Sequence, residues 1–355
     1  MAYGRVVNLG PRAPHGVGHG GIATLLLFLY AVLVGAAGCS EDSEPGTDPK
    51  PSALTPSDTG LPPVETLDEA HGRTLHVDDA DWIQVIDGVP WTTVPEAVVR
   101  LSPQTGKETA RIKTDTGTCT AMDVGYGALW AGDCSGPSRL LRIDPGSGRL
   151  IASIPLGGGL VPEGSVAADT GGVWAIVSAR SGVRLVRIDP ATNQVTDRFP
   201  VPSSAVGVRA GLGGVWVTDP GNGRLLRIDP ATGRILARTK TGAGARFFSV
   251  GEGGVWVQNN VDGTVTRVDP KTDKVVATIP VDGGFIRGGD LAVGGGYVWA
   301  RVSSTLVAQV DPATNTAVVS YGPGAGSGSV AADDKLVWIT AHDVDAIYRV
   351  PVAKP

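Results

Sequence analysis

The chain has 355 residues, with 51 glycines, 26 prolines and 42% hydrophobic residues, which fits one large repeat domain or two ordinary ones. Many short strands joined by tight turns have such a composition, whereas helical proteins and disordered polymers do not. Asp and Glu (35) outnumber Lys and Arg (30), for a net charge of −5. No overall basic field exists to hold a polyphosphate, so we expect no nucleic-acid partner.

Residues 1–38 have the features of an export signal. Arg5 and Arg12, with no acid before residue 22, precede the apolar run "IATLLLFLYAVLV", which is too short to span a bilayer comfortably. The following "AAGC" resembles the bacterial lipobox, with Ala36 where Leu is usual. We expect Cys39 to anchor the protein to the cell-envelope membrane through a lipid, outside the cytoplasm. Simple secretion with a free cysteine is the alternative.

Residues 39–68 are dense in Pro, Ser, Thr and acidic residues and contain few residues able to form a core. This composition predicts a disordered tether that holds a folded domain, residues 69–355, away from the membrane.

A tryptophan recurs through the predicted domain at intervals of 39, 44, 42, 40, 43 and 39 residues: Trp91, Trp130, Trp174, Trp216, Trp256, Trp299 and Trp338. Seven units of this length are typical of the four-stranded blades of a β-propeller. In each unit the second strand carries the Trp, and we expect it to pack between blades. The sequence therefore predicts an all-β, seven-bladed propeller, which we expect to be monomeric.

A turn such as "DPATGR" joins the third and fourth strands of each of the first six units. Pro fixes φ, the preceding Asp accepts a backbone N–H, and Gly or Asn ends the turn. We therefore interpret five of these aspartates as turn formers: Asp144, Asp189, Asp229, Asp269 and Asp311. The seventh unit stops after three strands. We expect "GRTLHV" (72–77) to supply the fourth and close the ring.

Loops that join the fourth strand to the next first strand, and the second to the third, should surround one mouth of the central channel. Candidate ligand-binding residues in the first kind of loop are Glu163, Arg209, Arg246, Arg287 and Asp290. Three guanidiniums converging there would bind a carboxylate or phosphate. Alternatively, each Arg pairs with an acid or reaches solvent. Arg180 and Arg301, in loops of the second kind, fit either arrangement.

Ring closure would also bring two acidic loops together. One contains His76, Asp78 and Asp81, and the other contains His342 and Asp343. Two imidazoles and several carboxylates on adjacent loops are ligands for a divalent cation, the one cofactor that we consider. The alternative is a solvated acidic rim.

Cys119 and Cys134 are equidistant from the centre of a predicted hairpin at Tyr126 and Gly127. Directly opposed residues in a hairpin have Cβ atoms about 4.5 to 5.5 Å apart. In an exported protein this arrangement favours a disulfide over a free pair or a metal site.

The unit "GxGGVWVxxxxxGxLxRIDPxTGxVxAxIxV" resembles the YVTN-type and NHL-type repeat propellers, and particularly the virginiamycin B lyase-like group. The resemblance covers residues 72–355. It implies a seven-bladed propeller and, for the lyase group, opening of a streptogramin ester ring by a histidine base, a glutamate and Mg²⁺ at the channel mouth. The middle blades have no His in their entry loops, so we assign no catalytic residue.

Taken together, these patterns favour a lipid-anchored propeller that binds a small anionic ligand, a cell-wall fragment or an envelope protein at its mouth. The alternative is a virginiamycin B lyase-like, metal-dependent enzyme acting at the same mouth, with Glu163, His342 or the acids near Asp81 as acid and base groups.

Overall fold

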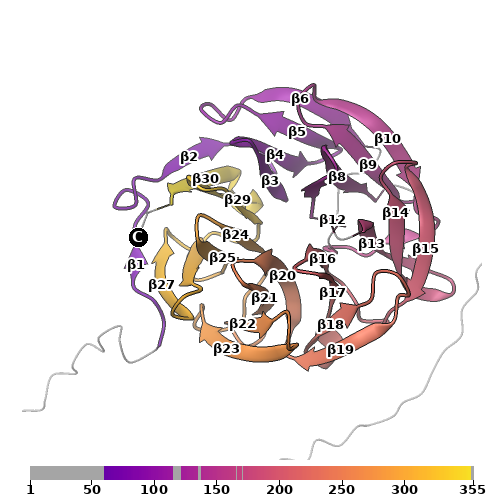
Figure 1. The fold of residues 1–355 in the computed structure, drawn as a ribbon. Helices are drawn as coiled ribbons and strands as arrows, with labels where there is room; N and C mark the ends of the chain where they lie inside the picture. The colour runs from indigo at the N-terminus through magenta and orange to yellow at the C-terminus, as the bar shows by residue number, and fades with distance from the viewer. Residues whose placement is uncertain (1–59, 115–120, 135–136, 165, 170, 353–355) are drawn as a thin grey trace, which may run out of the picture. The chain divides into compact units, whose positions relative to one another are not determined.

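The computed structural model describes residues 60–352 except 115–120, 135–136, 165 and 170. The predicted signal, Cys39, the tether as far as residue 59, and Cys119 lie outside this part, so the lipid anchor and the disulfide stay predictions. Seven separate sheets are arranged around a central axis (Figure 1). The predicted seven-bladed propeller of four-stranded blades is confirmed.

Blades one to four follow one another along the chain, and each begins with its innermost strand. Blade one contains β3 (Ile83–Ile86), β4 (Val89–Val94), β5 (Ala97–Leu101) and β6 (Glu108–Lys113). Blade two contains β7 (Asp123–Gly125), β8 (Ala128–Asp133), β9 (Arg139–Asp144) and β10 (Arg149–Pro155). Blade three contains β12 (Val166–Asp169), β13 (Gly172–Ala179), β14 (Gly182–Asp189) and β15 (Gln194–Pro200), with β11 (Gly159–Leu160) also paired to β13. Blade four contains β16 (Val208–Gly211), β17 (Gly214–Asp219), β18 (Arg224–Ile228) and β19 (Ile235–Lys240).

The remaining blades complete the ring. Blade five contains β20 (Ala245–Gly251), β21 (Gly254–Asn259), β22 (Thr264–Asp269) and β23 (Lys274–Pro280). Blade six contains β24 (Leu291–Gly294), β25 (Tyr297–Arg301), β26 (Val307–Asp311) and β27 (Thr316–Tyr321). Blade seven contains β28 (Val330–Ala332), β29 (Leu336–Ala341), β30 (Ala346–Pro351) and β2 (Arg73–His76). Two short 3₁₀ turns, η2 (Pro220–Asn222) and η3 (His342–Val344), lie in loops, and no helix in the described ranges is long and apolar enough to cross a membrane.

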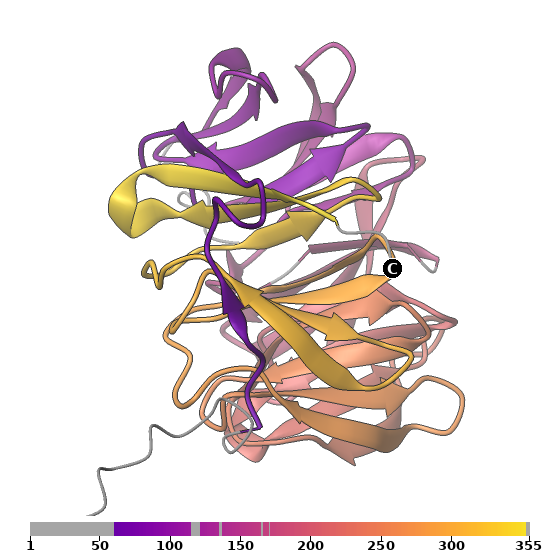
Figure 2. The ribbon, with the colours of Figure 1, turned by 90° about the vertical axis from the view of Figure 1, so that its left-hand side faces the viewer.

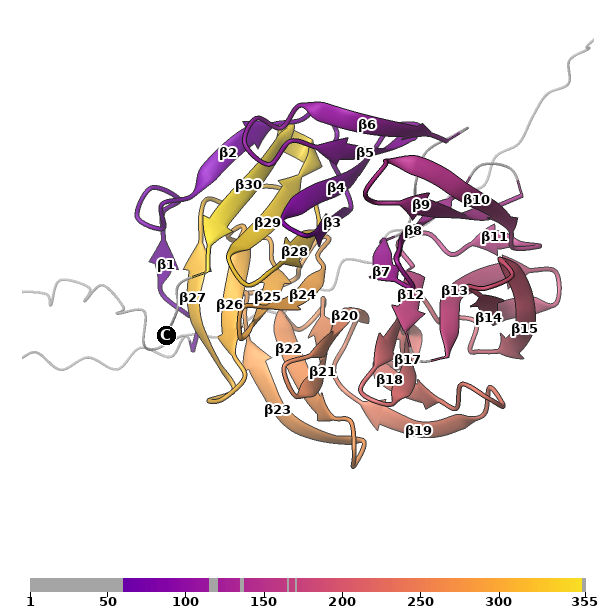
Figure 3. The same cartoon turned by 45° about the horizontal axis from the view of Figure 1, so that its top comes forward.

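The N-terminal strand closes the ring as the sequence predicted. β2 pairs antiparallel with β30, with Leu75 opposite Ile347 (Figure 3). Both side chains are buried and belong to one core cluster with Trp338. Blade seven therefore combines three C-terminal strands with one N-terminal strand, and neither end leaves an open seam.

The chain joins the domain earlier than the predicted boundary at residue 69. β1 (Val64–Glu65) pairs in parallel with β27 on the outer edge of blade six. The N–H of Ser320 donates to the carbonyl of Pro63 at 2.8 Å, and Leu67 packs against the cluster that contains Trp299. Figure 2 shows this segment crossing the outside of the last two blades. Composition did not reveal this contact because two paired residues leave almost no pattern.

The seven repeat tryptophans lie between blades, as predicted, and each is 0–1% exposed. In blades two to six the indole N–H donates to the carbonyl five residues earlier, at 2.9 to 3.3 Å. An arginine on the third strand stacks over the tryptophan of its own blade at 4.9 to 5.9 Å from the ring centroid; these arginines are Arg100, Arg142, Arg187, Arg227, Arg267 and Arg349. We call them the rim arginines.

Rim arginines also join neighbouring blades. A guanidinium nitrogen of Arg142 donates to the carbonyl of Pro190 at 2.6 Å, and that of Arg267 donates to the carbonyl of Pro312 at the same distance. These prolines belong to the "DP" turns of the next blade, so in these two pairs of blades the repeat provides both the donor and the acceptor. The aspartates of these turns accept the backbone N–H two residues on, at 2.7 to 2.9 Å, which confirms their role as turn formers.

Candidate ligand-binding site

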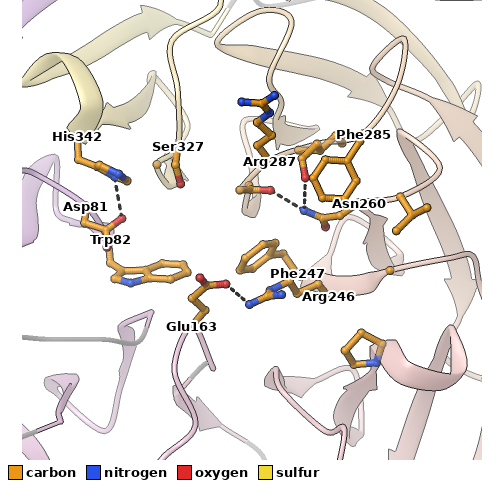
Figure 4. Close-up of a pocket in the computed structure, with 17 residues that line it drawn as sticks. Asp81, Trp82, Glu163, Arg246, Phe247, Asn260, Phe285, Arg287, Ser327 and His342 are labelled. Atoms are coloured by element: carbon orange, nitrogen blue, oxygen red, sulfur yellow. Dashed lines mark hydrogen bonds and ion pairs between the residues drawn. The ribbon is translucent and has the colours of Figure 1, made fainter. Parts of the chain in front are cut away.

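The antiparallel blades place the predicted mouth loops on one rim, and a cavity of about 360 Å³ opens there. Its lining side chains come from six blades and are far apart in the sequence (Figure 4). Most precede an inner strand or lie at its start: Asp81 and Trp82 come before β3, Glu163 before β12, and Phe285 and Arg287 before β24, whereas Arg246 and Phe247 lie in β20. His342 at the start of η3 completes this set.

Trp82 and Phe247 form an apolar floor that the sequence analysis missed. Their ring centroids are 6.0 Å apart with an interplanar angle of 52°, and both residues are at least nine-tenths buried. Phe285, by contrast, is 61% exposed at the edge of the cavity. A signal for Trp82 was present, because it is the one tryptophan of eight that breaks the repeat spacing.

Arg246 and Glu163 form an ion pair across the cavity wall, which matches the alternative interpretation of the mouth arginines. The guanidinium of Arg246 also lies 5.6 Å from the centroid of the Phe247 ring. Glu163 has a left-handed backbone conformation (φ 56°), which a non-glycine residue adopts infrequently. Because Glu163 and Arg246 form an ion pair, the charges of these two predicted site residues compensate each other.

Arg287 is the exposed cation of the cavity, and its guanidinium has no ion-pair partner among the residues that the structure describes. Its loop is fixed from two sides. The backbone N–H of Arg287 donates to Ser303 Oγ at 2.9 Å. Asn260 Nδ2 donates to the carbonyls of Ile286 and Gly288 at 3.0 and 2.6 Å.

Arg209 and Asp290 do not line the mouth. They lie between the inner strands, in a polar section of the channel of about 200 Å³, with Arg209 Nη2 3.9 Å from Asp290 Oδ1. Asp290 also accepts from Ser329 Oγ at 2.6 Å. The predicted convergence of three guanidiniums is therefore wrong. Arg209 is paired opposite Trp216, inside the channel, whereas the residue opposite Trp256 in blade five is Ser249, three residues after Arg246.

Burial dominates the electrostatics of the channel. It raises the pKa of Asp290 and of Asp123, and the nearby Arg209 opposes this shift for both carboxyls. Four turn aspartates differ, since hydrogen bonds lower the pKa of Asp144, Asp189, Asp229 and Asp269.

A histidine between two carboxylates lies at the blade-seven side of the cavity. His342 Nε2 is 2.6 Å from Asp343 Oδ1, and His342 Nδ1 is 3.6 Å from Asp81 Oδ1. Burial raises the pKa of Asp81, and the His342 charge opposes that shift. This group gives the mouth an acid and base pair.

The five predicted metal ligands are not brought together. His76 and Asp78 form an exposed pair of their own, with His76 Nε2 3.2 Å from Asp78 Oδ1. Within the described ranges, no three His, Cys, Asp or Glu residues are arranged to hold a metal ion. The prediction was right that β2 is the outer strand of blade seven, but His76 at its end is exposed and pairs with Asp78, and neither residue lines the cavity that Asp81 and His342 line.

Arg301 is fully buried and is not a mouth residue. Its guanidinium donates only to backbone carbonyls, including those of Leu306 (3.0 Å), Thr340 (3.3 Å) and Ala325. Burial lowers its pKa to about 10, so it stays charged at neutral pH. Arg301 therefore fixes the loop that leads to Ser327 and Gly328 in the cavity wall.

The chain matches no protein-family model and no curated protein sequence. Solved structures resemble it in fold. The β-propeller domain of Cps50 (Swd1) from Myceliophteria thermophila has a TM-score of 0.65 at 13% identity, covering 79% of this chain and 98% of that one. The Neurospora crassa Pan2 WD40 domain has a TM-score of 0.63 at 10% identity (78% and 90% covered), and the RRP9 WD40 repeats 0.64 at 12% (79% and 97%). These likenesses show a seven-bladed β-propeller of the architecture found in WD40 domains.

Proposed function

We propose that this chain is an exported binding protein, anchored to the cell-envelope membrane through Cys39, whose propeller binds a small organic ligand at the mouth cavity. The observation that carries this proposal is the combination of an aromatic floor, Trp82 with Phe247, and an uncompensated cation, Arg287, in one cavity. Ligand sites typically join an apolar surface to a few placed polar groups. A cavity of about 360 Å³ suits a small molecule or the end of a cell-wall fragment.

A thermal-shift screen of the purified protein tests this proposal. The panel contains anionic metabolites, glycans and soluble cell-wall fragments. A ligand at about 100 times its Kd adds about 2.7 kcal/mol to the unfolding free energy and raises the melting temperature by several degrees. Arg287→Gln should reduce the shift. The control is Arg180→Gln, because Arg180 is exposed on a loop of the same rim but does not line the cavity. No shift with any small molecule would contradict the proposal and favour an envelope-protein partner.

A second candidate is enzymatic, and the grouping of Asp81, His342 and Glu163 around the cavity favours it. A raised carboxyl pKa beside a histidine is suited to general acid and base catalysis. Incubation with a streptogramin, with and without Mg²⁺, tests the lyase-like reaction. Ring opening that is lost in His342→Ala would establish the enzyme, whereas an intact substrate after prolonged incubation would eliminate this reaction.

The export part of the proposal has its own test. Globomycin treatment of cells should cause a precursor of higher apparent mass to accumulate, and Cys39→Ser should release the protein from the membrane fraction. An unchanged mobility and unchanged membrane association would eliminate the lipid anchor.

A further inference from the structure

The charges around the cavity limit what its ligand carries. Arg246 and Arg287 provide two positive charges, and Glu163 and Asp81 provide two negative charges. Because Glu163 is paired with Arg246, Arg287 is the accessible, uncompensated positive charge of the cavity among the described residues. A phosphate dianion would bring two charges close to the Asp81 and Glu163 carboxylates, whereas a single carboxylate matches Arg287 in charge and in its two-pronged geometry.

The aromatic side chains define a second requirement. Trp82 and Phe247 provide the floor, Phe285 stands exposed at the edge, and Figure 4 shows Arg287 across the cavity from Trp82. Aromatic faces stabilise a flat surface with polarised C–H bonds or another ring. The ligand therefore has one flat apolar face within reach of its carboxylate.

Unused acceptors supply the third requirement. Asn260 lines the cavity and is 6% exposed. Its Nδ2 donates both hydrogen bonds to carbonyls of the Arg287 loop. Its Oδ1 has no hydrogen-bond partner among the described residues. The Asp81 and Glu163 carboxylates are half-exposed acceptors in the same cavity. Buried acceptors without donors are costly, and hydroxyl groups on a ligand would satisfy them.

Building on the proposed function, we propose that the mouth binds a sugar acid: a six-membered sugar ring bearing one carboxylate. The C–H face of the ring lies against Trp82 and Phe247. Its carboxylate pairs with Arg287, and its hydroxyls donate to Asn260, Asp81 and Glu163. An aromatic carboxylate shares the flat face and the charge, but it leaves the acceptors unsatisfied.

Calorimetric titration of the intact protein with four probes tests the ligand class: glucuronate, galacturonate, glucose and benzoate. We expect at least one uronate to bind about tenfold more tightly than glucose or benzoate, a difference of about 1.4 kcal/mol. Arg287→Gln should abolish that preference over glucose, and Phe285→Ala, at an exposed position, should weaken the uronate without affecting folding. Arg180→Gln is the matched control and should bind as the unchanged protein does.

Four results would overturn this inference. Benzoate binding as tightly as either uronate would indicate an aromatic ligand, and glucose binding equally well would remove the role of Arg287. If no uronate binds while the broader thermal-shift panel yields a ligand sensitive to Arg287→Gln, the sugar-acid class is wrong and the proposed function stands. If neither experiment yields a ligand, both proposals are wrong.

Discussion

The rim of "DP" turns and the mouth on the opposite side of the ring use aspartate and arginine for different purposes. On the turn rim, hydrogen bonds lower the pKa of turn aspartates such as Asp229, and rim arginines such as Arg142 stack on tryptophan. At the mouth and in the channel, burial raises the pKa of Asp81 and Asp290. The arginines there form ion pairs or, like Arg287, have no acidic partner among the described residues.

This difference separates residues that build the ring from residues that make each blade distinct. A residue that recurs in every unit has the same surroundings in each blade, and so it serves the repeat. Residues without equivalents elsewhere, such as Trp82 and Arg287, gather at the mouth. Departure from the repeat is therefore a better guide to the candidate site than residue type.

The largest expected effect comes from removing the N-terminal strands that close the ring, because both the turn rim and the mouth need a closed ring. Deleting residues 61–76 removes β1 and the closing strand β2, including buried Leu75. The outer edge of blade seven is then unpaired, and we expect loss of cooperative unfolding and aggregation. Circular dichroism melting and size-exclusion chromatography measure both. A soluble monomer with a sharp transition would show that ring closure by β2 is not essential for folding. The control is a chain that starts at residue 60.

Arg301→Met is expected to have the next largest effect. The change leaves several buried carbonyls without donors, and each buried acceptor left unsatisfied costs about 1 to 3 kcal/mol. Urea denaturation measures the change in unfolding free energy. A loss below about 1 kcal/mol would mean that water replaces the guanidinium.

Arg142→Met compared with Arg246→Met tests the two sets of arginines directly. Arg142 loses a cation–π contact and a hydrogen bond to Pro190, which together amount to about 2 kcal/mol. Arg246 loses an exposed ion pair, so its cost should stay below about 1 kcal/mol. Ligand binding should change only in Arg246→Met. Equal losses of unfolding free energy in the two variants would contradict the distinction between rim arginines and mouth arginines.

Stability against pH should show the smallest effect, with opposite signs on the two faces. The Asp81 pKa is raised in the folded state, so its contribution falls as pH rises from the unfolded value of about 3.9 through the raised folded value. Asp81→Asn should thus gain stability relative to the unchanged protein above that window. The Asp229 pKa is lowered, so its contribution exists above about 3.9 and is lost as pH falls through the folded value. Asp229→Asn should lose stability at neutral pH. Urea denaturation at several pH values tests both, and slopes of the same sign would contradict the comparison.

The sequence predicted the fold in detail because each blade repeats one pattern. Tryptophan spacing located the seven blades, and the missing last strand predicted the role of β2. The mouth was predicted only in part. Loop membership identified Glu163, Arg246 and Arg287, but pairing between distant blades decides which charges stay free, and one sequence does not contain those distances. Arg209 was misplaced because the sequence does not show the strand register, which pairs Arg209 with Trp216 inside the channel.

The two-residue strand β1 has a mechanical consequence. A pull on the chain ahead of residue 60 reaches β1 before it reaches β2, because β1 comes first and lies on a different blade. The few bonds around Pro63 and Glu65 would then yield while the closing strand is still unloaded. Under such a pull, β1 would detach from the edge of blade six before the force reached β2 and opened the ring.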